Sequence, residues 1–77
     1  MSVRTLSELQ PHQKGKVVKV RGQGDLRRRL VDMGFVAGSD FQVERVAPLG
    51  DPVEIKIKGY HLTLRKEEAA NVEVEVE

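Results

Sequence analysis

Histidine and cysteine, the side chains that most often bind transition metals or act as catalytic groups, are scarce in this 77-residue sequence. It contains two histidines, His12 and His61, and no cysteine. Neither histidine lies in a His-x-x-His or His-Glu-x-x-His pattern, so the sequence predicts no dedicated metal site. Coordination of a metal ion by both imidazoles is a separate hypothesis, which would give the protein a metal-sensing role.

The glycines do not form a nucleotide-binding motif. Gly22 and Gly24 are followed by Arg27, where a dinucleotide fingerprint requires a third glycine. A Gly-Lys-Ser or Gly-Lys-Thr phosphate loop is also missing. Because no nucleophile is paired with a base, we expect the protein not to be an enzyme and to need no cofactor.

A short basic helix is the clearest element that could position a functional surface. Asp25 is a good N-cap, because its carboxylate can accept hydrogen bonds from the first turn. Gly34 ends the helix after about two turns, because glycine readily adopts a positive φ. The apolar residues recur at i, i+4 and i+7, so one stripe faces the core; they are Leu26, Leu30 and Met33.

Three consecutive arginines occupy the rest of this helix. Arg27 and Arg28 point towards water, whereas Arg29 lies at the edge of the apolar stripe. We expect Arg29 to anchor the helix through Asp32 or backbone carbonyls. Asp25 precedes Arg28 and Arg29 in the order that favours helix ion pairs. The arginines therefore form either a solvated face held by the helix's own charges or a basic surface for an acidic partner.

The net charge of +1 hides an uneven distribution. Residues 1–39 carry eight basic and three acidic side chains, whereas residues 40–77 carry five basic and nine acidic ones, which gives +5 and −4. The basic half can meet an acidic partner or pair with the acidic half. No apolar run approaches the ~20 residues of a membrane span, and the N-terminus does not resemble a signal peptide. We expect a soluble cytoplasmic protein without direct membrane insertion.

Alternating apolar and polar residues predict five short strands. They contain residues 16–21, Phe41 and Val43, residues 53–57, Leu62 and Leu64, and residues 72–76. This predicts a mainly β fold, a small SH3-like barrel that forms one domain over residues 1–77. The helix lies between strands one and two, whereas the oligonucleotide-binding fold carries its helix between strands three and four.

Three details refine this barrel. Lys14 and Gly15 are typical of a turn that leads into the first strand. The alternation slips at residues 45–46, which predicts a bulge or bend. The glutamates of the last strand are expected to lie beside Lys56 and Lys58 or to protect an exposed sheet edge.

The aromatic residues argue against nucleic-acid binding. Phe35 and Phe41 fall on apolar positions and are expected in the core, whereas Tyr60 lies at a hairpin tip. One exposed ring is a weak stacking platform, so we expect no nucleic-acid partner.

The loop of residues 47–52 contains two prolines and one glycine, which make its backbone rigid. Leu49 within this loop has two possible roles. It either presents an exposed apolar anchor to a partner at low ordering cost, or folds back as a lid on the barrel.

The combined motifs resemble the FeoA family, small accessory proteins of bacterial ferrous iron uptake, over nearly the whole chain. The similarity rests on Leu6-x-x-Leu9, Arg28-Arg29-Leu30-x-x-Met33-Gly34-Phe35-x-x-Gly38, Ala47-Pro48-Leu49-Gly50-Asp51-Pro52-Val53, and Gly59-Tyr60-x-Leu62-x-Leu64-Arg65-x-x-Glu68-Ala69. Two departures are Ala37, where the family often has proline, and the sequence His12-Gln13-Lys14.

The resemblance implies an SH3-like barrel that binds FeoB, a membrane transporter whose cytoplasmic part is a G-protein-like GTPase. Similar barrels form the C-terminal domains of iron- or manganese-dependent repressors, which is an alternative, as is a small nucleic-acid-binding barrel. No helix-turn-helix precedes the barrel in this sequence, which favours the transport accessory role. Partner contact is expected through Arg27, Arg28, Leu49 and Asp51, which lie on the basic helix and the proline-bounded loop.

Overall fold

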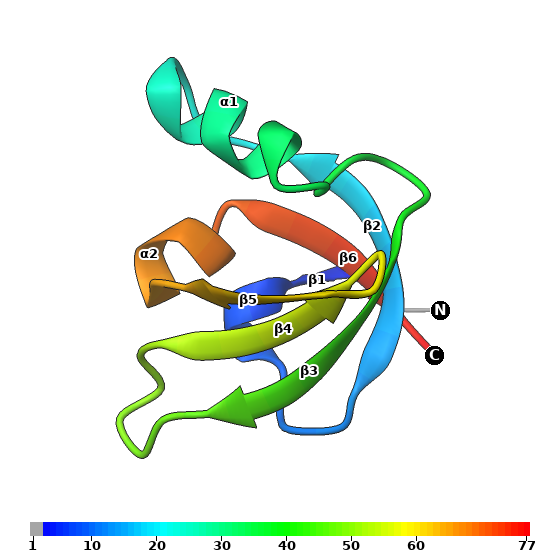
Figure 1. The fold of residues 1–77 in the computed structure, drawn as a ribbon, viewed down its shortest axis with the longest axis vertical. Helices are drawn as coiled ribbons and strands as arrows, with labels where there is room; N and C mark the ends of the chain where they lie inside the picture. The colour runs from blue at the N-terminus through cyan, green and yellow to red at the C-terminus, as the bar shows by residue number, and fades with distance from the viewer. Residues whose placement is uncertain (1–2) are drawn as a thin grey trace.

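The computed structural model describes residues 3–77, which form six β-strands and three short helical segments (Figure 1). In chain order these are β1 (Val3–Thr5), the 3-10 helix η1 (Leu6–Glu8), β2 (Lys14–Val20), α1 (Asp25–Asp32), β3 (Asp40–Val46), β4 (Val53–Ile57), β5 (Tyr60–Leu64), α2 (Lys66–Ala69) and β6 (Val72–Val76). No helix in this described range has the length and apolar character needed to cross a membrane.

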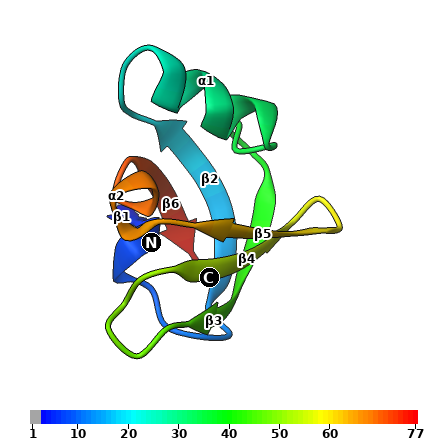
Figure 2. The ribbon, with the colours of Figure 1, turned by 60° about the vertical axis from the view of Figure 1, so that its left-hand side comes forward.

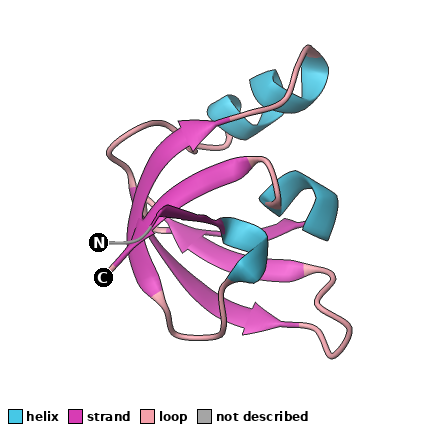
Figure 3. Cartoon of the chain, turned by 180° about the vertical axis from the view of Figure 1, so that it is seen from behind, coloured by secondary structure: helices cyan, strands magenta, loops and turns pink. Residues whose placement is uncertain are grey.

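The strands form one antiparallel sheet in the order β1-β6-β2-β3-β4-β5, which curls into a partly open barrel (Figure 3). The mainly β class is confirmed, but the expectation of five strands with a helix between the first two is wrong. The structure has six strands, and α1 follows the second. The missed strand, β1, has three residues and no apolar alternation, because its pairing with β6 defines it.

The last strand lies inside the sheet, between β1 and β2. Its Glu73 and Glu75 are opposite Lys19 and Lys16 of β2, and Glu73 also forms an ion pair with Arg21. The expectation that these glutamates lie beside the lysines of β4 or protect an edge is therefore wrong. The prediction that these glutamates attract lysines on a neighbouring strand was correct, but it named the wrong strand.

The core is continuous from the barrel interior to the underside of α1. Leu30 is fully buried, and Leu26 and Met33 are partly buried against the core, which confirms the predicted stripe. The other buried apolar residues are Leu6, Leu9, Val17, Val20, Phe35, Phe41, Val43, Val53, Ile55, Ile57, Leu64, Ala69, Val72 and Val74. η1 and α2 follow the two edge strands and contact each other, so they bridge the open side of the barrel.

Backbone hydrogen bonds define the end of α1. Phe35 N–H donates to the Leu30 carbonyl at 3.1 Å, and Gly34 N–H donates to the Val31 carbonyl at 3.0 Å. With Gly34 at φ 108°, these bonds form a Schellman motif, as the glycine predicts. The start differs, because Gly24 is the N-cap and Asp25 is already the first helical residue.

Gly15 lies within β2 and not in a turn, so that prediction is wrong. A Cβ atom at Gly15 would lie 1.8 Å from the Glu75 carbonyl oxygen of β6. Glycine is therefore required here by the close approach of two strands and not by a change of chain direction. β3 contains an irregularity, as predicted, but slightly earlier than residues 45–46, since the β3–β4 register shifts between Val43 and Arg45.

Candidate partner-binding surfaces

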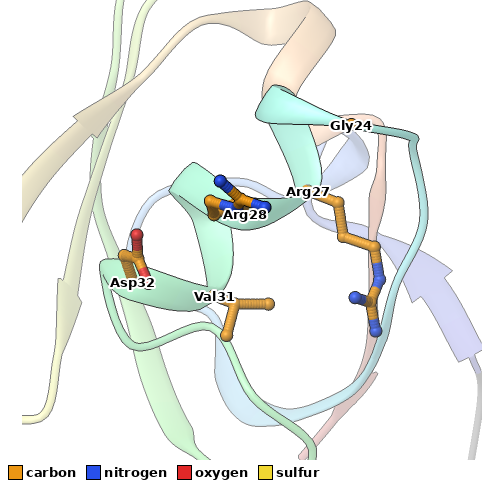
Figure 4. Close-up of a pocket in the computed structure, with 5 residues that line it drawn as sticks. All are labelled: Gly24, Arg27, Arg28, Val31 and Asp32. Atoms are coloured by element: carbon orange, nitrogen blue, oxygen red, sulfur yellow. The ribbon is translucent and has the colours of Figure 1, made fainter.

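The outer face of α1 carries the first candidate surface. Gly24, Arg27, Arg28, Val31 and Asp32 line a shallow depression of about 280 Å³ (Figure 4). Both arginines are exposed, as predicted, and their side chains extend in different directions from the helix. The depression combines cationic groups with the half-buried apolar side chain of Val31. Such a surface suits an acidic partner with an adjoining apolar residue.

Arg29 has a structural partner that the sequence did not reveal. Its Nη2 lies 3.4 Å from Oε2 of Glu68, a buried residue of α2. Glu68 Oε1 also accepts a hydrogen bond of 2.8 Å from the backbone N–H of Arg65. Arg29 therefore anchors α1 as expected, but through α2 and not through Asp32. Asp32 is near in sequence, whereas Glu68 becomes a neighbour only when the barrel forms.

The loop between β3 and β4 carries the second candidate surface. Gly50 N–H donates to the Ala47 carbonyl at 2.7 Å, which closes a turn with Pro48 at its second position. Proline restricts φ there, and Ala47 N–H donates to the Pro52 carbonyl at 3.1 Å across the loop base. Leu49 is 90% exposed at the tip. The alternative that Leu49 folds back onto the barrel is therefore wrong.

Asp51 is bound within its own chain. Its Oδ1 accepts a hydrogen bond of 3.1 Å from the backbone N–H of Lys66, and its Oδ2 lies 4.0 Å from Nη1 of Arg65. Both partners lie at the start of α2. The carboxylate therefore holds the proline-bounded loop against α2, although the residue remains exposed enough for a partner to reach.

The structure places these two surfaces at opposite ends of the molecule. Figures 1 and 2 show α1 at one end of the long axis and the β3–β4 loop at the other. The four predicted contact residues thus form two pairs, Arg27 with Arg28 and Leu49 with Asp51. They do not form one continuous docking face.

The histidines have local roles in the described structure. His61 Nδ1 lies 2.6 Å from Oε1 of Glu44, and the backbone N–H of His12 donates to the Val43 carbonyl at 2.7 Å. Across residues 3–77, no three histidine or carboxylate side chains are grouped closely enough to hold a metal ion. Among the aromatic residues, Phe35 and Phe41 are buried and Tyr60 is 68% exposed, as predicted.

Comparison with known proteins identifies a family model, the FeoA domain, that matches residues 4–76. A Fe(2+) transport protein A/Fe(2+) transporter FeoB fusion protein of Porphyromonas gingivalis is 45% identical over 71 residues. That alignment covers 92% of this chain but only 8% of the fusion protein, so the chain corresponds to a small part of this relative.

Solved structures show the same architecture. A FeoA-like protein from Clostridium acetobutylicum is 38% identical, with a TM-score of 0.89 over 99% of this chain and 88% of that one. FeoA of Stenotrophomonas maltophilia, solved with zinc and described as an SH3 domain protein, is 32% identical, with a TM-score of 0.82 over 92% of this chain and 88% of that one. A manganese-dependent repressor reaches a TM-score of 0.89 at 16% identity over 100% of this chain and 38% of that one, which shows a shared fold alone.

Proposed function

Because this chain belongs to the FeoA family, we propose that it is an accessory protein of ferrous iron uptake that acts by binding an FeoB transporter. The proposal rests on the Porphyromonas gingivalis relative, in which an FeoA sequence is fused to FeoB. Fusion makes an interaction intramolecular and raises its effective concentration, which is useful when the two parts act together.

Binding, not catalysis, is the activity that this small barrel supports. The exposed residues of the two candidate surfaces include Arg27 and Arg28 on α1 and Leu49 on the proline-bounded loop. A rigid turn that presents an exposed leucine loses little conformational entropy on binding. Exposed arginines accelerate association with an acidic surface and select for it. We assign these residues to contact with the cytoplasmic GTPase part of FeoB.

A direct titration tests this proposal. The purified chain is titrated by calorimetry into the cytoplasmic part of FeoB from the same organism, with and without guanine nucleotide. We expect saturable binding that weakens as salt is raised, because part of the contact is ionic. Absence of binding to this part, and also to full-length FeoB in detergent, would contradict the proposal.

The FeoB titration does not test two alternatives, a nucleic-acid-binding barrel and a repressor-type domain. A second assay addresses them. A labelled oligonucleotide at low salt would be retarded by a nucleic-acid-binding protein, and the effect would decrease steeply with salt. We expect no retardation. We also propose a cytoplasmic location, because the proposed contact is with the cytoplasmic part of FeoB. Fractionation with FeoB-containing membranes tests it.

A further inference from the structure

We infer that a groove between residues 36–40 and the β4–β5 hairpin binds an acidic segment of a partner protein. Two adjoining depressions of about 440 and 300 Å³ form this groove and share Asp40 and Lys58. The remaining lining residues are Val36, Ala37, Gly38 and Ser39 in the first depression, and Phe41, Gln42, Lys56 and Gly59 in the second. We call this surface the lysine groove; it includes none of the residues assigned above to partner contact.

The charge of the lysine groove is positive and largely uncompensated. Lys56 and Lys58 are both exposed, and neither has a carboxylate within 4.0 Å among residues 3–77. Asp40 is the one acidic residue in the lining, and its carboxylate lies 3.5 Å from Nζ of Lys16. Two free ammonium groups therefore face solvent beside a carboxylate that is already paired.

The sheet register extends this cationic character across neighbouring strands. Lys14 of β2 is opposite Gln42 of β3, and Gln42 is opposite Lys56 of β4. Neighbouring strands are ~4.8 Å apart, so the backbones of Lys14 and Lys56 are about 10 Å apart, with Gln42 between them. A carboxylate placed over Gln42 can accept hydrogen bonds from its amide and attract both ammonium groups.

The side chains that line the lysine groove favour a protein segment over a nucleic acid. The β4–β5 hairpin projects from the barrel (Figure 2) and contributes Lys58 and Gly59 to the lining. Phe41, the aromatic residue of the lining, is 4% exposed and cannot stack on a base, whereas Val36 and Ala37 offer apolar contact for methylene groups. Carboxylate side chains on an extended chain match these properties.

An NMR titration with a defined probe tests the lysine groove without reference to FeoB. The ¹⁵N-labelled protein is titrated with a ten-residue peptide of alternating glutamate and serine, and with a matched lysine–serine peptide. We expect the acidic peptide alone to shift the amide signals of Ala37, Gln42, Lys56 and Lys58. These shifts should decrease at 0.5 M salt, because exposed charges are then screened over a few ångströms.

Substitutions distinguish the groove from a general charge effect. Lys56→Gln with Lys58→Asn should weaken peptide binding about five- to tenfold, since each removed ion pair is exposed. Asparagine suits position 58, where φ is 51°. The control, Arg4→Gln with Lys19→Gln, removes the same charge outside the groove and should change binding less than twofold. Asp40→Asn should strengthen binding about twofold, because it removes a carboxylate that repels the peptide.

The inference would be overturned by shifts confined to other surfaces, by equal responses to the acidic and basic peptides, or by equal weakening by the groove and control variants. The absence of any shift at millimolar acidic peptide would overturn it as well, and so would groove shifts produced only by phosphatidylglycerol vesicles or by an oligonucleotide. Preserved dispersion in the ¹⁵N spectra shows that each variant is folded. A failed FeoB titration with a positive peptide result would contradict the proposed function and leave the lysine groove intact.

Discussion

At the scale of single residues, Leu49 offers a test that separates binding from stability. Leu49→Ala removes an exposed side chain at the tip of a hydrogen-bonded turn. We expect the free energy of unfolding to change by less than ~0.5 kcal/mol. Affinity for FeoB should decrease by ~1–2 kcal/mol if the leucine enters an apolar pocket. Calorimetry and urea denaturation measure the two quantities, and Val18→Ala, another exposed apolar truncation, is the control. Unchanged affinity would remove Leu49 from the interface.

Arg28 tests the basic surface of α1 in the same way. Arg28→Glu reverses an exposed charge on the outer face of the helix. We expect about tenfold weaker FeoB binding at low salt, chiefly through slower association. Arg4→Glu applies the same charge change on β1 and should have little effect on the association rate. Equal effects of both variants, measured by stopped-flow mixing, would indicate only a net-charge effect.

Residue environments were predictable where a local pattern determines them. The spacing of Leu26, Leu30 and Met33 correctly predicted the buried stripe, and Gly34 correctly predicted the helix end. The partner of Arg29 was not predictable, because Glu68 is 39 positions away and its contact exists only in the folded barrel. The contact role of Arg27, Arg28, Leu49 and Asp51 stays a prediction.

At the scale of elements, Glu68 connects the two α-helices. Glu68→Ala removes the acceptor for Arg65 N–H and the ion pair with Arg29. We expect the free energy of unfolding to fall by ~1–3 kcal/mol, because a helix-end donor loses its partner. Glu68→Gln should cost less, since its amide oxygen can still accept the hydrogen bond. Glu67→Ala, an exposed neighbour, is the control in urea denaturation. Equal stability of Glu68→Ala and Glu67→Ala would show that the contacts of Glu68 with Arg65 and Arg29 do not stabilise the fold.

Gly15 tests the contact between two strands. Gly15→Ala would place a methyl group 1.8 Å from the Glu75 carbonyl oxygen, so β2 and β6 would have to separate. We expect a loss of ~3 kcal/mol in unfolding free energy. Gly50→Ala has open space around its Cβ but a φ of 83°, and should cost about 1 kcal/mol from backbone strain. A smaller loss for Gly15→Ala than for Gly50→Ala in thermal denaturation would contradict the close strand approach.

The elements that were mispredicted are those defined by long-range pairing. β1 has three residues and is a strand only because it pairs with β6. β6 lies between β1 and β2, so its glutamates lie beside Lys16 and Lys19. Periodicity identifies a strand and its faces but does not identify the neighbouring strand. The strand pattern and the position of the helix predicted the SH3-like architecture, and the family resemblance implied the same barrel. The strand order required the structure.

At the scale of the whole molecule, the separation of the two candidate surfaces predicts additive effects. Arg28 belongs to α1 and Leu49 to the β3–β4 loop, and these two elements lie at opposite ends of the barrel (Figure 1). If both contact FeoB, the double variant should lose the sum of the two single losses in binding free energy, to within ~0.5 kcal/mol. A double-mutant cycle by calorimetry measures this sum. A coupling energy above 1 kcal/mol would show that the two contacts do not contribute independently to the binding free energy.

If FeoB contacts both ends of the barrel, as proposed, the barrel works as a spacer. Its longest dimension is 29 Å, and its ends are joined by hydrogen-bonded strands and a buried core. Two segments that grip it from opposite sides are therefore held at a fixed separation. Movement of one segment must then either move the other segment or break one of the two contacts. Binding at both ends would therefore depend on the distance between the two segments of the partner.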